Sequence, residues 1–194
     1  MADSRIIKFA GYRICVNDEV YEPAEDSQLL LEIIKINKGD KVLDMGSGTG
    51  ILGLHAYSLG ASTVYFIDIN PYATIATMCT LKINGINDYE VINCDLLSCL
   101  RNFKFDVAIF NPPYLPFEEF NKWIGYSWSG GTSGAEVISR FLKEINANRV
   151  YILYSSLTDE DKVLSSLTRF KIINKRERTF GFETLVALEL VKND

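Results

Sequence analysis

The chain has 194 residues, of which 47% are hydrophobic, and its formal net charge is −5 at pH 7. This size and composition suit one globular domain with a substantial core, so we expect residues 1–194 to form a single domain. The acidic balance argues against direct binding to nucleic acid, because contacts to phosphates need clustered cations. We expect no membrane span and no secretory signal, because no apolar run reaches about 18 residues.

Cysteine and histidine usage gives no sign of a metal site. The chain has one histidine, His55, and four cysteines: Cys15, Cys79, Cys94 and Cys99. These follow neither CxxC nor mixed His/Cys ligand spacing, so we predict no bound metal. Unpatterned cysteines are typical of reduced thiols, which predicts an intracellular, cytoplasmic protein without a disulfide framework.

Helix-length segments alternate with short apolar runs along most of the chain. Nearly continuous apolar runs predict strands that are buried on both faces, at 41–45, 63–69, 106–111 and 149–155. A more polar run at 88–95 predicts an edge strand. Helices are expected at 22–39, entered through Pro23, and at 49–60, 71–85 and 133–146. The runs at 169–178 and 182–191 predict a closing antiparallel hairpin. The pattern indicates an α/β, doubly wound, Rossmann-like fold with a seven-stranded, mostly parallel sheet and a C-terminal antiparallel hairpin.

A glycine-rich segment follows the first buried strand. Asp44 ends the strand in "VLDMGSGTGILG", and three glycines precede the next helix: Gly46, Gly48 and Gly50. Glycines here let the backbone turn tightly and approach a ligand closely. A dinucleotide-binding GxGxxG pattern would need glycine at Ile51. Asp44 would also repel a pyrophosphate, whereas it would attract the ammonium group of a ligand.

Acidic residues also end the next two strands. Asp68 closes "FIDIN", where its carboxylate can accept hydrogen bonds from the two hydroxyls of a ribose. Asp95 and Leu96, in "NCDLL", suit the amino group and the flat face of an adenine. Each acid alone could be a helix cap or a turn residue, but together they fall where open α/β sheets bind ligands. A nucleoside with a zwitterionic tail and no phosphate fits this set, which predicts S-adenosyl-L-methionine as the cofactor.

The strand at 106–111 ends in the motif Asn111, Pro112, Pro113 and Tyr114. A planar amide or an exocyclic amine is a poor nucleophile, because its lone pair is delocalised. The Asn111 side-chain oxygen and the Pro112 carbonyl would accept its hydrogens and align it, while Tyr114 stacks on its plane. A proline-rich turn that only stops the strand is the simpler interpretation. The nearby glycine loop and acids favour the catalytic one.

The series "DMGSGTG", "DIN", "CD" and "NPPY" resembles the class I methyltransferases that modify amino or amide nitrogens. The flanking segments "VYEPAEDSQLLLE" and "SWSGGTSGAEVISRFL" resemble, more specifically, the archaeal and eukaryotic HemK-like release-factor glutamine methyltransferases. The resemblance runs from about Val20 to Leu190. It implies an enzyme that methylates N5 of the glutamine amide in the Gly-Gly-Gln motif of a translation release factor.

The same resemblance implies cofactor contacts and a partner. The contacts of the family fall on Ser27, Asp44, Gly46, Asp68, Asp95, Leu96 and Asn111. Enzymes of this branch work with a small zinc-binding activator subunit, which implies a heterodimer. We expect that subunit to dock on the predicted edge strand, around Val91 and Ile92.

Two other acceptor classes stay open. An exocyclic amine of an RNA or DNA base could replace the amide with the same chemistry, although the acidic charge weighs against it. A lysine of another protein is also possible. A non-catalytic binding module would have no chemical use for the NPPY motif and the three acids.

The segment at 115–133 is rich in aromatic residues and glycines and contains both tryptophans of the chain. Irregular segments of this length in a compact domain are usually functional or disordered. Two interpretations are equally supported. The segment is either a lid that orders on a peptide substrate or an apolar cluster that covers the end of the sheet.

Overall fold

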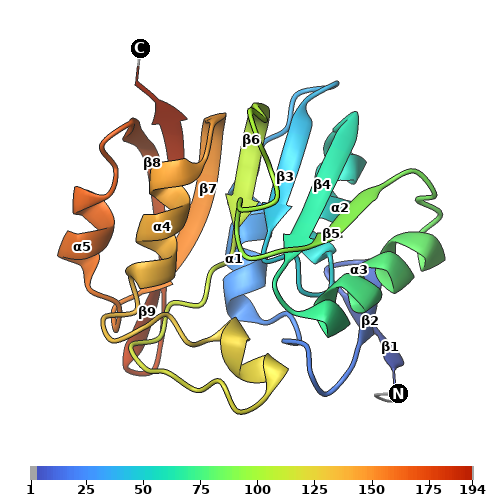
Figure 1. The fold of residues 1–194 in the computed structure, drawn as a ribbon, viewed down its shortest axis with the longest axis horizontal. Coiled ribbons are helices and arrows are strands. Elements are labelled where there is room, and N and C mark those ends of the chain that lie inside the picture. The colour runs from blue at the N-terminus through green and yellow to red at the C-terminus, as the bar shows by residue number, and fades with distance from the viewer. Residues whose placement is uncertain (1–3, 194) are drawn as a thin grey trace.

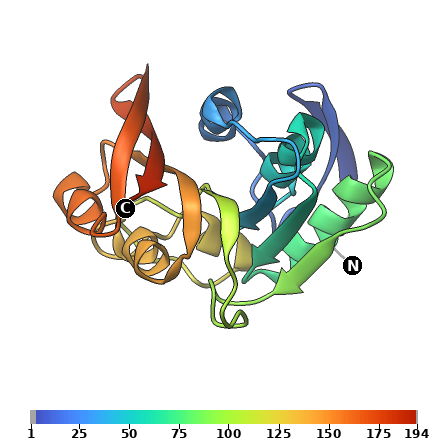
Figure 2. The same cartoon turned by 90° about the horizontal axis from the view of Figure 1, so that it is seen from above.

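The computed structural model describes residues 4–193, which form a central sheet with helices on both faces (Figure 1; Figure 2). The strands are β1 (Arg5–Phe9), β2 (Tyr12–Val16), β3 (Lys41–Met45), β4 (Thr63–Asp68), β5 (Glu90–Asn93), β6 (Phe105–Phe110), β7 (Ala147–Ser155), β8 (Phe170–Phe180) and β9 (Glu183–Lys192). The helices are α1 (Glu25–Ile33), α2 (Ile51–Leu59), α3 (Pro71–Ile83), α4 (Glu136–Glu144), α5 (Glu160–Ser165) and the 3₁₀ helix η1 (Trp123–Ser127).

Seven strands make the main sheet, in the order β5-β4-β3-β6-β7-β9-β8. Strands β3 to β7 are mutually parallel, β9 runs antiparallel to β7, and β8 pairs with β9 as an antiparallel hairpin. The predicted fold class is therefore confirmed. Because the parallel strands all run the same way, their carboxyl ends meet at one edge of the sheet.

Alternate residues of the buried strands face two separate apolar clusters. On β3, Val42 packs with the side chains of α1 and α2, whereas Leu43 packs with those of α4 on the other face. This follows from the period of two along a strand, which sends successive side chains to opposite faces. It also explains why the four central strands have nearly continuous apolar sequences.

Helix α1 is shorter than the sequence pattern predicts. It ends at Ile33, because Ile34 adopts an extended conformation with φ −62° and ψ 128°. The next residue donates its backbone N–H to Tyr151 Oη at 3.0 Å. Ile34 is thereby buried in the same cluster as the helix. Packing on the sheet has overridden helical periodicity here.

A hairpin near the N-terminus, formed by β1 and β2, was not predicted. Its two-residue turn consists of Ala10 and Gly11, with φ values of 48° and 86°. Two residues with positive φ suit the turn that joins twisted antiparallel strands. The hairpin packs β2 against α3 and so adds to the sheet face that carries α1 and α2.

The prediction of reduced thiols is wrong for two of the four cysteines. Cys15 of β2 and Cys79 of α3 form a disulfide, whereas Cys94 and Cys99 are free. The bridged residues are 64 positions apart, so their pairing depends on the unpredicted hairpin. The same contact includes a hydrogen bond from the Cys15 N–H to Thr80 Oγ1 at 2.9 Å.

We expect the disulfide to contribute measurably to the free energy of unfolding. We expect the double variant Cys15→Ala, Cys79→Ala to lose about 2–4 kcal/mol of unfolding free energy, because the bridge restricts the unfolded chain. Urea titration of the wild type and the variant measures this loss. The pair Cys94→Ala, Cys99→Ala is the matched control and should unfold close to the wild type. Equal midpoints for the bridge variant and the wild type would contradict the prediction.

Candidate active site

A cavity of about 380 Å³ opens at the carboxyl ends of β3, β4 and β6. Twelve residues were predicted to form the site, and nine of them line this cavity: Ser27, Gly46, Gly48, Asp68, Asp95, Leu96, Asn111, Pro112 and Pro113. The other three, Asp44, Gly50 and Tyr114, are not lining residues. The fold thus brings together residues from five separate segments of the chain.

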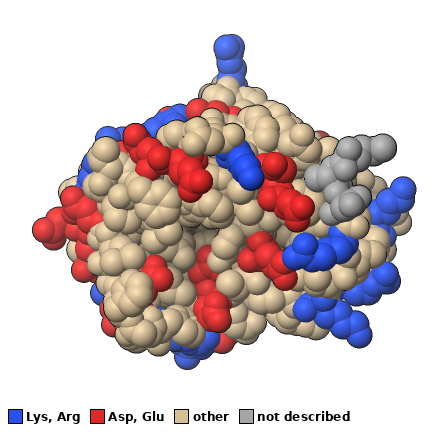
Figure 3. All heavy atoms as spheres, turned by 90° about the horizontal axis from the view of Figure 1, so that it is seen from below, with Lys and Arg blue, Asp and Glu red and all other residues tan. Residues whose placement is uncertain are grey.

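Acidic side chains surround the opening of the cavity. Figure 3 views the molecule from below, the side on which η1 lies in Figure 1, and shows a hollow with acidic side chains around it. The acids that line the cavity are Asp26, Asp68, Asp95, Glu118 and Glu136. A ligand or substrate group with positive charge would be favoured at this face.

Asp44 is buried beneath the glycine loop. Its Oδ2 accepts a hydrogen bond from the Gly53 N–H at 2.8 Å, whereas its Oδ1 is buried with no partner among the described residues. A Cβ at Gly53 would lie 2.2 Å from the ring of Phe66 and 2.9 Å from Asp44 Oδ2, so only glycine lets α2 approach this closely. Burial raises the pKa of Asp44 well above its usual range, and the neighbouring Asp68 adds to that rise.

Asp68 ties the glycine loop to the end of β4. Its Oδ2 accepts from the Gly48 N–H and its Oδ1 from the Asn70 N–H, both at 2.8 Å. Gly48 has a φ of 54°, which turns its N–H toward the carboxylate. Burial raises the pKa of Asp68 to about 6, although these backbone hydrogen bonds oppose the rise.

The third predicted acid lies on a more exposed wall. Asp95 Oδ2 pairs with Arg140 Nη2 of α4 at 3.0 Å, and the two side chains are 48% and 53% exposed. Leu96 beside it is buried, with a φ of 46°, a conformation that is rare for leucine. Arg140 could not be predicted from the sequence, because a single arginine on a helix gives no spacing signal.

Asn111 presents its carboxamide at the cavity. The Nδ2 group donates to Asp26 Oδ2 at 2.9 Å. The Oδ1 atom is buried and has no hydrogen-bond partner among residues 4–193. A buried acceptor without a partner is costly unless a ligand supplies the donor.

The rest of the NPPY motif is held by a glycine-rich segment. A Cβ at Gly130 would lie 2.8 Å from the Pro113 carbonyl oxygen, and one at Gly134 would lie 2.3 Å from that of Tyr114. Thr158 Oγ1 also donates to the Tyr114 carbonyl at 2.7 Å. The Tyr114 ring packs against the apolar clusters on both faces of the sheet. The segment that singled out one branch of enzymes in the sequence therefore lies directly on the NPPY backbone.

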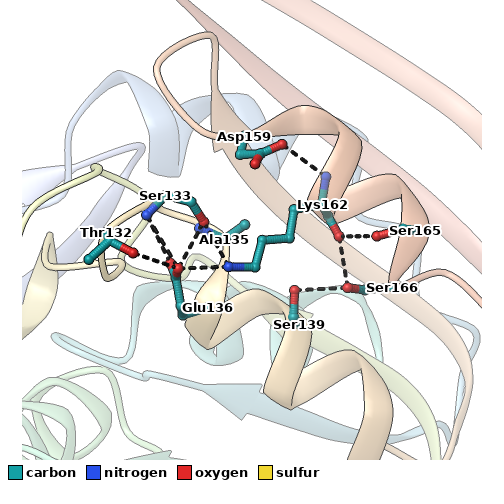
Figure 4. A network of polar contacts seen from close by, with 9 residues as sticks. All are labelled: Thr132, Ser133, Ala135, Glu136, Ser139, Asp159, Lys162, Ser165 and Ser166. Carbon is teal, nitrogen blue, oxygen red and sulfur yellow. Dashed lines mark hydrogen bonds and ion pairs between the residues drawn. The ribbon is translucent and has the colours of Figure 1, made fainter.

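A polar network fixes that glycine-rich segment to α5 (Figure 4). Glu136 Oε1 accepts from Lys162 Nζ at 2.7 Å, from Ser133 Oγ at 3.0 Å and from Thr132 Oγ1 at 3.1 Å. Burial alone would raise the pKa of Glu136, but the hydrogen bonds, chiefly from Lys162, lower it to about 2. Glu136 therefore stays ionised, and the segment that covers the NPPY motif is anchored.

The aromatic segment at 115–133 forms one wall of the cavity. Its two ends are joined, because the Leu115 N–H donates to the Trp128 carbonyl and the Gly130 N–H to the Leu115 carbonyl, each at 3.0 Å. Between them, Phe120 and Trp123 lie 4.8 Å and 5.3 Å from Tyr126, measured between ring centroids. Phe120 and Tyr126 line the cavity. The segment is thus an aromatic cluster with one face on the cavity.

Residues 4–193 contain no group of three His, Cys, Asp or Glu side chains that could hold a metal ion. Within the same residues, no helix is long and apolar enough to cross a bilayer.

Known proteins share sequence with most of this chain. The family model described as "Methyltransferase small domain" matches residues 21–124. A Methanocaldococcus jannaschii protein, provisionally named a protein N5-glutamine methyltransferase, is 36% identical over 193 residues, covering 94% of this chain and 97% of the relative. Human methyltransferase HEMK2 is 36% identical over 136 residues, covering 63% of each chain.

Solved structures have the same fold. The Mtq2 chain in the E. cuniculi Mtq2–Trm112 complex, which methylates the eRF1 translation termination factor, matches with a TM-score of 0.69 and 26% identity. The match covers 90% of this chain and 99% of that one. The tRNA m1G37 methyltransferase of M. jannaschii gives a TM-score of 0.70 at 20% identity, over 98% of this chain and 57% of its own. At that identity the likeness shows the fold alone.

The buried position of Asp68 predicts a pH dependence of stability. Its pKa rises from the usual 3.8 to about 6 in the folded protein, so the folded state holds this proton more tightly than the unfolded state does. The stabilising contribution is full below the unfolded pKa and is lost as the pH rises through the folded pKa. We expect Asp68→Asn, which cannot ionise, to gain stability relative to the wild type as the pH rises from about 4 to about 7.

Urea unfolding at several pH values measures the difference between the two proteins. The exposed acid variant Asp88→Asn is the matched control. A difference between Asp68→Asn and the wild type that stays constant with pH would contradict the prediction.

Proposed function

The chain belongs to the methyltransferase small domain family, and we propose that it methylates a glutamine side-chain amide of a translation release factor with S-adenosylmethionine as the methyl donor. The observation that carries the proposal is the Asn111 side-chain oxygen, which is buried with no hydrogen-bond partner in the described part of the chain and lies at the wall of a cavity that Asp68 also lines. The relatives named for glutamine or eRF1 methylation support an amide as the acceptor.

The residues around the cavity fit S-adenosylmethionine. Thr49 lines the cavity, and its buried Oγ1 lacks a hydrogen-bond partner among the described residues, so a polar atom remains for a ligand beside the glycine loop. Asp44 Oδ1 also lacks a partner there, but it lies beneath the loop and does not line the cavity. Asp68 would take the ribose hydroxyls, and Leu96 would supply an apolar surface for the adenine. When bound, this cofactor supplies an electrophilic methyl group on its sulfonium.

The chain's own task is to align a weak nucleophile. In the proposal, Asn111 Oδ1 and the Pro112 carbonyl accept the two hydrogens of the glutamine amide and so fix the direction of its nitrogen. Pro113 limits the motion of the motif, and Tyr114 supports it from the apolar side. No base is required before transfer, because the amide proton becomes acidic only after the nitrogen is alkylated.

We further propose that residues 1–194 act as one methyltransferase domain, in the cytoplasm, where release factors act. Two observations weigh against a nucleic-acid acceptor. The net charge is −5, and acidic side chains surround the cavity opening.

A small activator subunit is proposed to dock on the edge strand β5. Trm112 accompanies Mtq2 in the related complex. Among residues 4–193, β5 pairs with β4 and with no other strand. The Cys94 N–H donates to the Asp68 carbonyl on the side of β4. Because successive N–H groups of a strand point to opposite sides, those of Val91 and Asn93 point away from β4, to the open edge. An added strand could pair with them, and any zinc would be the partner's own.

Transfer of a labelled methyl group from S-adenosylmethionine tests the function. The acceptors to compare are a release factor, its Gln→Asn variant in the Gly-Gly-Gln motif, and RNA, each with and without the activator subunit. We expect label in the release factor alone and none in the Gln→Asn variant. Label in RNA but not in the release factor would overturn the proposal.

In the same assay, Asn111→Ala should lower kcat by at least about 100-fold, because it removes a fixed acceptor at the reacting nitrogen. Its affinity for S-adenosylmethionine, measured by calorimetry, should stay within a few-fold of the wild type. Equal loss of cofactor binding and transfer would show that Asn111 holds the cofactor and not the acceptor.

Binding of the activator should depend on the open edge of β5. Val91→Pro removes an outward N–H without removing a hydrogen bond to β4, so we expect it to abolish co-purification with the activator. Ile173→Pro is the matched control, because Ile173 lies at a bulge in β8, the opposite edge strand. Isolation of the wild type as a fully active monomer would contradict the heterodimer.

A further inference from the structure

Asp26 is a buried acid with no part in the reaction as proposed above. It lies in the first turn of α1 and is only 4% exposed. It is 85 positions from Asn111, yet the two side chains share a hydrogen bond of 2.9 Å. A buried carboxylate needs several donors to offset its loss of hydration.

The two oxygens of Asp26 have different partners. Oδ1 accepts from the Ser27 N–H at 2.6 Å, from Ser27 Oγ at 3.2 Å and from Tyr21 Oη at 3.2 Å. Oδ2 accepts from Asn111 Nδ2. The donors to Oδ1 come from α1 and the residues before it, so they hold the carboxylate plane while Oδ2 faces the NPPY motif.

An ionised carboxylate can only accept hydrogen bonds. The Asn111 amide must therefore turn its NH₂ group toward Asp26, and its oxygen must face the other way. If the Asn111 amide were reversed, its oxygen would lie at hydrogen-bond distance from Asp26 Oδ2 with no hydrogen between the two atoms, and they would repel each other. The oxygen that is directed away is Oδ1, which is buried and has no hydrogen-bond partner within the described residues.

We propose that Asp26 is a positioning residue that locks the Asn111 carboxamide with its oxygen toward the acceptor. The inference rests on the proposed function, in which that oxygen accepts a hydrogen from the nitrogen to be methylated. A reversed Asn111 would present its own hydrogens to those of the substrate amide. Asp26 thus acts on transfer through Asn111, and we expect it to affect kcat more than KM.

Exchanging the two side chains tests this. Asp26→Asn leaves the orientation of the Asn111 amide unfixed, because a carboxamide at position 26 can either donate to it or accept from it. Asn111→Asp places two carboxylates against each other. In the double variant D26N/N111D, the carboxamide at position 26 keeps its oxygen on Ser27 and Tyr21 and donates to the carboxylate at position 111. The other oxygen of that carboxylate then faces the acceptor, as in the wild type.

We expect D26N to lower kcat by about 10- to 100-fold, the range for losing a hydrogen bond to a charged group. N111D should lose at least as much, and the double variant should recover at least about tenfold over N111D. Cofactor affinity should stay within a few-fold of the wild type in all three. Glu25→Gln, at the exposed neighbouring acid, is the matched control. If the kcat of the double variant falls by the product of the two single-variant losses while cofactor binding stays intact, the positioning role is overturned.

A second measurement does not need transfer. In the ¹H–¹⁵N spectrum, the Asn111 side-chain NH₂ should give two separate signals that are protected from solvent exchange, and Asp26→Ala should remove the protection while distant amide signals persist. Unchanged protection in Asp26→Ala would overturn the inference. Protection that is lost as expected, together with a wild type that methylates no glutamine, would support the contact and refute the proposed function.

Discussion

The carboxylate of Asp68 is the contact on which the rest of the site depends. It accepts the N–H groups of Gly48 and Asn70, and so joins the glycine loop after β3 to the start of α3. From that helix, Thr77 Oγ1 donates back to the Gly48 carbonyl at 3.1 Å. The loop is thus held from both sides before any ligand binds. The arrangement has a cost, because Asp44 and Asp68 are buried close together and burial raises the pKa of each. Binding of a ligand with positive charge and hydroxyl donors would offset that cost and so stabilise the folded protein.

Most of the fold could be predicted, because its strongest signals are local. A strand buried on both faces has a nearly continuous apolar sequence, and 41–45 matches β3 residue for residue. The parts that could not be predicted depend on distant contacts. The end of α1 is set by packing on β7, where Tyr151 receives the N–H of Lys35. The first hairpin has mixed, half-exposed strands, and the disulfide exists only because that hairpin reaches α3.

The site shows the same division. Residues at strand ends were predictable, because parallel topology gathers those ends at one edge whatever the loops do. Thr49, Gly53 and Arg140 were not predictable, because their roles depend on contacts between distant parts of the chain. Thr49 has a buried hydroxyl with no partner among the described residues, Gly53 allows α2 to approach Phe66 closely, and Arg140 pairs with Asp95 at the cavity wall. For Tyr114, the sequence suggested an orientation that the structure does not have. Its place in a motif suggested a ring that faces the ligand, but its side chain packs toward the sheet.

The joined ends of the aromatic segment have a consequence for how such proteins change over time. Leu115 is hydrogen-bonded to both Trp128 and Gly130, so the chain leaves the NPPY motif and returns to it at a closed neck. Beyond that neck, residues can be inserted, removed or exchanged at little entropic expense, since loop closure depends only weakly on length. The acceptor motif would keep its geometry throughout. The length and sequence of the segment can therefore change without moving the motif that follows β6.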